Sequence, residues 1–131
     1  MNAPVSRVSN QSSENWQTIR DIIRNPGQFS SNHDISRIIE RLGKMLDSVS
    51  IIGQLRRERR QAVWVLVIVL FVHGWDTPEN RQEVLNIISE WKVDEAIFYE
   101  MKDTAETYRV ITSQNDKRDL DKSIKDLIEI G

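Results

Sequence analysis

Four arginines lie within five consecutive positions near the middle of the chain, and they are the residues best suited to chemistry with a partner. They are Arg56, Arg57, Arg59 and Arg60, with Glu58 between them. On a helix, residues three or four apart are neighbours, so the four guanidinium groups would lie within two turns. A guanidinium group donates paired hydrogen bonds to phosphate or carboxylate oxygens. This arginine box therefore predicts an anion-binding surface.

The anion that fits the box most directly is the phosphate backbone of RNA or of another nucleic acid. Three further basic residues would support such binding, namely Arg37, Arg41 and Lys44. Two features oppose it: the chain has a formal net charge of −2, and no aromatic residue lies within the box to stack on bases. Contacts to phosphates alone would depend only weakly on base sequence.

The alternative is that the box pairs with the rest of the chain. Residues 1–72 contain ten Lys or Arg against six Asp or Glu, whereas residues 73–131 contain eight against fourteen. Opposite charges in the two halves can pair within the folded protein, and exposed pairs of this kind contribute little to stability. In that case the arginines shield the end of an apolar helix and bind no partner.

Eleven consecutive apolar residues, 62–72, begin directly after the box and Gln61. As a helix this segment would reach about 16 Å, which is too short for the roughly 30 Å hydrocarbon core of a bilayer. We therefore expect no membrane span, and we predict a central buried helix over residues 54–73. The segment is rich in apolar area for a small bundle, which favours closure of the surplus by a second copy of the chain.

Apolar residues recur at helical spacing on both sides of the central segment, as in Ile35, Ile38 and Leu42. The pattern predicts an all-α, single-domain bundle of about six helices, residues 13–131, preceded by a flexible N-terminal arm, residues 1–12. Glycines and prolines lie mostly between the predicted helices, as expected. The last predicted helix carries Leu120, Ile124, Leu127 and Ile128.

Three residues are candidates for contact with a protein partner. Trp75 follows Gly74 in a predicted loop, and an exposed tryptophan is a common anchor at interfaces. Phe98 and Val110 lie off the apolar stripe predicted for their helix. All three could also pack in the core, which is the commoner arrangement for such residues.

The chain contains no cysteine and only two histidines, His33 and His73. This composition excludes disulfides, thiol nucleophiles and cysteine-based metal sites. Neither histidine belongs to a metal-binding or nucleophile motif, and the five glycines are scattered singly rather than gathered in a phosphate-binding loop. We expect no enzymatic activity, no metal, no cofactor and no small-molecule substrate.

The sequence thus predicts a non-enzymatic helical interaction module that binds a protein partner and self-associates. RNA binding through the arginine box is the alternative. A peripheral membrane protein that places the same arginines on anionic lipid is a third and weaker hypothesis, and a membrane is not the partner we expect. Residues 1–7 contain no apolar core, so we expect no classical secretion signal and a cytoplasmic or nuclear location.

Overall fold

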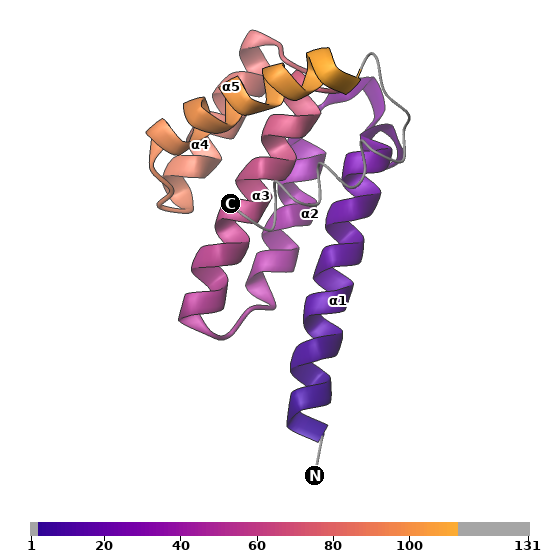
Figure 1. The fold of residues 1–131 in the computed structure, drawn as a ribbon, viewed down its shortest axis with the longest axis vertical. Coiled ribbons are helices and arrows are strands. Elements are labelled where there is room, and N and C mark those ends of the chain that lie inside the picture. The colour runs from indigo at the N-terminus through magenta and orange to yellow at the C-terminus, as the bar shows by residue number, and fades with distance from the viewer. Residues whose placement is uncertain (1–2, 113–131) are drawn as a thin grey trace.

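Three helices run alongside one another, and two further helices cross them near one end (Figure 1). The computed structural model describes the backbone of residues 3–112 and the side chains of residues 14–107. The five α-helices are α1 (Ala3–Arg24), α2 (Ile35–Asp47), α3 (Ile52–Phe71), α4 (Pro78–Glu90) and α5 (Glu95–Thr112). Two short 3-10 helices, η1 (Pro26–Gln28) and η2 (Ser31–His33), connect α1 to α2. The predicted all-α fold is confirmed.

Helix α3 lies at the centre of the fold and contacts the other four helices. Its residues 62–71 are each 6% exposed or less, while Val72 is half-buried just beyond the helix. The side chains that cover them come from every other helix, for example Ile22, Leu42, Ile88 and Phe98. The predicted central apolar helix is therefore confirmed, with observed bounds that differ by two residues at each end.

Helix α1 begins earlier than the sequence predicted. Its backbone is helical from Ala3, so most of the predicted flexible arm, residues 1–12, belongs to the first helix. Pro4 does not prevent this, because it lies in the first turn of the helix. Backbone N–H groups there have no hydrogen-bond partner within the helix, so the N–H that proline lacks is not needed. The absence of an apolar stripe in this polar stretch concealed its helical start.

The cap of α2 also differs from the simplest sequence pattern. Ser31, a residue type that often caps helices, begins η2, and Asp34 caps α2. One Asp34 carboxylate oxygen, Oδ1, accepts from the Ser36 backbone N–H at 3.0 Å and from its hydroxyl at 2.6 Å. These hydrogen bonds to Ser36 hold the pKa of Asp34 below its usual value.

The turn between α3 and α4 folds back onto the bundle. Gly74 has φ +80°, a conformation that favours glycine, and the Trp75 N–H then donates to Val69 O at 3.3 Å. The buried side chain of Asn80 fixes this turn, because its Nδ2 donates to Trp75 O at 2.8 Å and to His33 O at 2.7 Å. Asn80 Oδ1 accepts from the Ile35 N–H, which ties the starts of α2 and α4 together.

The last predicted helix, with Leu120 and its neighbours, lies outside the described residues, as does the C-terminal part of the predicted domain. Among the helices that the structure describes, none combines the length and the apolar character needed to cross a membrane.

Candidate functional site

The arginine box occupies the first half of α3, at the end of the bundle remote from α4 and α5 (Figure 1). Successive residues of a helix are turned by about 100°, so the four arginines share one arc of about 160°. Glu58 lies opposite this arc. Arg56, Arg57 and Arg60 are exposed, and Arg59 is half-buried. The box therefore forms one continuous basic surface of the helix, which we call the arginine face.

The arginine face has no carboxylate partner among the described side chains. Within residues 14–107, no ion pair joins any of its four guanidinium groups to a carboxylate. Arg81 provides a contrast: its Nε and Nη2 donate to the two carboxylate oxygens of Asp76, and this contact raises the pKa of Arg81. The predicted pairing of the box with the acidic half is not found among the described side chains.

The start of α3 adds to the positive potential. Its N-cap residue is Ile51, whose side chain cannot cap, and the first turn contains no acidic residue. The backbone N–H groups of a helix start carry partial positive charge, which acids or capping oxygens usually offset. At α3 this offset is missing, and the basic surface extends to the end of the helix.

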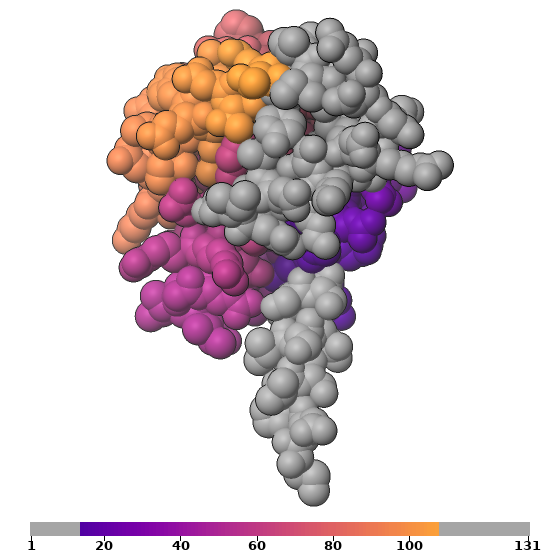
Figure 2. All heavy atoms as spheres, in the orientation of Figure 1, coloured from indigo at the N-terminus to yellow at the C-terminus, as the bar shows by residue number. Residues whose placement is uncertain are grey.

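Two exposed isoleucines lie beside the arginine face. Ile51 is 54% exposed and Ile52 is 77% exposed, and Tyr99 is the remaining large apolar residue with comparable exposure in the described part of the chain. Ile52 lies one turn before Arg56 and on the same side of α3. The α2–α3 end projects at the lower left of the space-filling view (Figure 2). It thus combines aliphatic and basic groups at one corner.

The three supporting basic residues lie on a different helix from the arginine face. Arg37, Arg41 and Lys44 are exposed on α2, where they line a hollow of about 180 Å³ next to Phe29. Glu40 lies among them, 3.9 Å from Arg37 Nη1 and 3.8 Å from Lys44 Nζ. None of the four arginines of the arginine face lines this hollow.

Two of the three predicted partner contacts are corrected by the structure. Trp75 is 3% exposed, because the Gly74 turn directs it inward, where its ring stacks on His33 at 4.8 Å between centroids. Phe98 is fully buried and packs against Phe71, with the ring centroids 6.1 Å apart. The side chain of Val110 lies outside the described residues.

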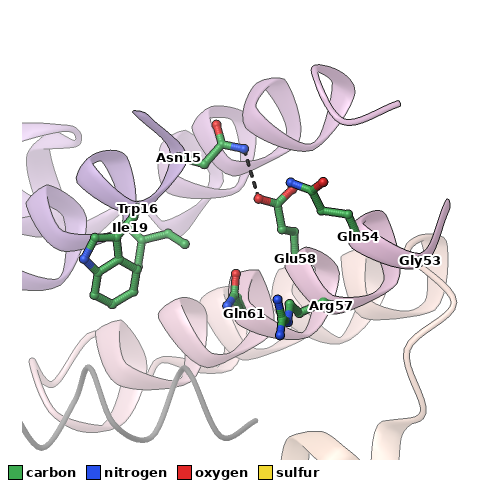
Figure 3. Close-up of a pocket in the computed structure, with 8 residues that line it drawn as sticks. All are labelled: Asn15, Trp16, Ile19, Gly53, Gln54, Arg57, Glu58 and Gln61. Atoms are coloured by element: carbon green, nitrogen blue, oxygen red, sulfur yellow. Dashed lines mark hydrogen bonds between the residues drawn. The ribbon is translucent and has the colours of Figure 1, made fainter. Parts of the chain in front are cut away.

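Glu58 is the member of the box region that the sequence did not single out. It is 5% exposed and points from α3 toward α1, where its Oε1 accepts from Asn15 Nδ2 at 3.1 Å (Figure 3). It lines a cavity of about 720 Å³ between the two helices. We call this space the Glu58 cavity; its walls include Asn15, Trp16 and Ile19 from α1 and Arg57, Glu58 and Gln61 from α3. Helical spacing could have predicted this burial, because it places Glu58 on the same helix face as Leu55, Ala62 and Val65.

The histidines form no catalytic constellation with one another. His73 Nε2 lies 2.6 Å from Ile23 O, and His33 packs on Trp75. In the portion of the chain that the structure describes, no group of three or more His, Asp or Glu side chains is arranged to hold a metal ion. Comparisons of the chain with protein-family models, with curated proteins and with solved structures found no match.

Proposed function

We propose that the protein is a non-enzymatic module that docks onto an anionic membrane surface through the α2–α3 end. One observation carries this proposal: the exposed isoleucines Ile51 and Ile52 lie beside four arginines that have no carboxylate partner among the described side chains. A surface that combines aliphatic and basic groups suits the boundary between lipid headgroups and acyl chains.

The expected energies indicate that the isoleucines and the arginines together favour membrane binding more than either group alone. A basic residue near an anionic leaflet contributes about 1 kcal/mol, and burial of an isoleucine contributes about 1.5–3 kcal/mol. A single signal of this size gives only marginal membrane binding, whereas two together give stable attachment. Anionic lipids are concentrated on the cytoplasmic leaflet, which is compatible with the cytoplasmic or nuclear location expected from the sequence.

RNA binding uses only half of this surface. Phosphate contacts would occupy the arginines, but they give no role to Ile51 and Ile52, and the box has no aromatic residue for base stacking.

Self-association stays a prediction. The surplus of apolar area that suggested it is smaller than expected, because residues 62–71 are buried by the chain itself. Light scattering at high protein concentration tests it directly.

Vesicle flotation tests the membrane proposal. The protein is mixed with vesicles of phosphatidylcholine alone or with phosphatidylserine added, and we expect binding only to the second, with strong weakening as salt rises. Two variants separate the contributions: the double change Ile51→Ser and Ile52→Ser, and the quadruple change of the four arginines to Gln. The serine pair should reduce partitioning about a hundredfold, because two buried isoleucines contribute about 3 kcal/mol or more.

Matched controls lie elsewhere on the same molecule. The change Tyr99→Ser removes an exposed apolar side chain, and the pair Arg37→Gln and Arg41→Gln removes two exposed charges; both should leave vesicle binding intact. The same variants are tested with a single-stranded RNA. Binding to RNA that needs the arginines but ignores the serine pair, without vesicle binding, would replace the membrane proposal by the RNA alternative.

A further inference from the structure

Glu58 has an unmet hydrogen-bonding requirement. Its Oε1 accepts from Asn15, but its Oε2 is buried and has no hydrogen-bond partner among the described residues. A buried polar atom without a partner costs about 1–3 kcal/mol, so native structures nearly always supply one. In Figure 3 this second oxygen lies on the side of Gln54, which also lines the Glu58 cavity. A hydrogen-bond donor within the cavity would satisfy it.

The Glu58 cavity has the size of a ligand site. Its volume of about 720 Å³ falls within the range of roughly 300–1,000 Å³ that is typical of small-molecule pockets. One water molecule occupies about 30 Å³, so a single bridging water would satisfy Oε2 and leave most of the space to other molecules. The cavity can therefore hold an organic molecule that has several functional groups.

The walls of the cavity offer two opposite charges and one apolar surface. Arg57 lines the same cavity as Glu58, and no ion pair joins these two neighbours, because adjacent helix residues point about 100° apart. Trp16, which is half-buried, and Ile19 form the apolar part on α1. The two opposite charges suit a ligand with both a cationic and an anionic group, and the apolar wall suits a hydrocarbon or aromatic part.

We propose that the Glu58 cavity binds a small zwitterion of the free amino acid class. The ligand's ammonium group donates to Oε2 of Glu58, its carboxylate accepts from the Arg57 guanidinium, and its side chain packs against Trp16. This inference goes beyond the membrane proposal. The two sites share Arg57, but neither Ile51 nor Ile52 lines the cavity, so the isoleucine variants separate them.

Tryptophan fluorescence and thermal shift provide the test. L-Phenylalanine at millimolar concentration is the first probe, compared with phenethylamine, which lacks the carboxylate, and with 3-phenylpropionate, which lacks the ammonium. We expect L-phenylalanine to raise the melting temperature and to change the emission, and we expect the emission change to vanish in Trp16→Phe. Both truncated probes should bind at least about tenfold more weakly, since each loses a charge-assisted hydrogen bond.

The variant Glu58→Gln keeps an oxygen for Asn15 but removes the negative charge, so the fold should remain while L-phenylalanine binding falls about tenfold or more. Glu40→Gln, on α2 and away from the cavity, is the matched control and should bind normally.

The remaining free L-amino acids are screened in the same way. The proposal is overturned if none binds, or if binding is the same for all three phenyl probes or is unchanged in Glu58→Gln. The Ile51→Ser and Ile52→Ser pair should keep amino acid binding, which separates this result from the vesicle experiment.

Discussion

The two halves of α3 differ in almost every physical respect, although they form one uninterrupted helix. Residues 62–71 are apolar on all sides and are covered by the other helices, whereas the first half is basic, largely exposed and uncapped. The far end of α3 is followed by the Gly74 turn and the Asn80 hydrogen bonds, while its start carries exposed isoleucines. The difference shows that one helix can supply both the core and the exposed surface. Substitutions in the buried half should therefore lower stability, whereas substitutions in the exposed half should not.

The largest effect should come from the buried half. Leu66→Ala removes a fully buried side chain at the centre of the core and should lower the free energy of unfolding by about 2–5 kcal/mol. Urea denaturation measures this loss. The matched change in the exposed half, Ile52→Ala, should alter stability by no more than about 0.5 kcal/mol. Similar losses from the two variants would contradict the contrast.

A smaller loss of stability should follow from removing the hydrogen bonds that fix the turn after α3. Asn80→Ala leaves the His33 and Trp75 carbonyl groups and the Ile35 N–H without their side-chain partner, which should cost about 1–3 kcal/mol. Asn86→Ala, in the same helix but exposed, is the control. Thermal unfolding of the two variants should separate clearly; an Asn80→Ala protein as stable as the control would mean that water replaces these bonds without cost.

The start of α3 should become more stable when its positive charge is reduced. Gly53 lies in the first turn of α3, and a Cβ atom added there meets no atom within 4 Å. Gly53→Glu should stabilise the protein by about 0.3–1 kcal/mol, because an acid in the first turn offsets the positive helix end. It should also weaken vesicle binding by neutralising Arg57 one turn later. Gly53→Ala separates the effects, since it should stabilise the helix and leave vesicle binding unchanged.

The smallest effect concerns pH at the cap of α2, where Asp34 has a lowered pKa. The carboxylate therefore contributes stability that is fully present above the pKa of the unfolded chain, about 3.9, and is lost as the pH falls through the lower folded value. In melting curves recorded across this range, wild type and Asp34→Ala should differ at neutral pH and converge in acid. A difference that persisted in strong acid would exclude the carboxylate as its cause.

Sequence patterns predicted the elements whose signal is local. The apolar residues 62–72 needed a covered helix whatever surrounded them, and the helices around α3 followed from spacing and from residues such as Pro78 and Gly74. Phe98 was misplaced because the buried side of α5 runs through Phe98, Met101 and Ala105, a register that depends on how α5 crosses α3. The spacing alone allowed either stripe.

The candidate sites depend on contacts between distant parts of the chain. The burial of Trp75 follows from the Gly74 turn and from Asn80, whose partners lie up to 47 positions away in sequence. Glu58 was read as a charge within a basic box, and its burial required knowledge that Asn15, 43 positions earlier, faces it. The arginine box itself was visible in the sequence, but the exposure of Ile51 and Ile52 beside it was not.

The central position of α3 has a consequence for how the chain is made. Synthesis proceeds from the N-terminus, so α1, α2 and α3 leave the ribosome before α5, the helix that contacts α3 most extensively. Until residues 95–112 emerge, one side of the most apolar helix in the protein lacks its cover. Nascent chains paused at this point would present a strongly hydrophobic surface to chaperones and to one another, and the addition of α5 covers that side of α3.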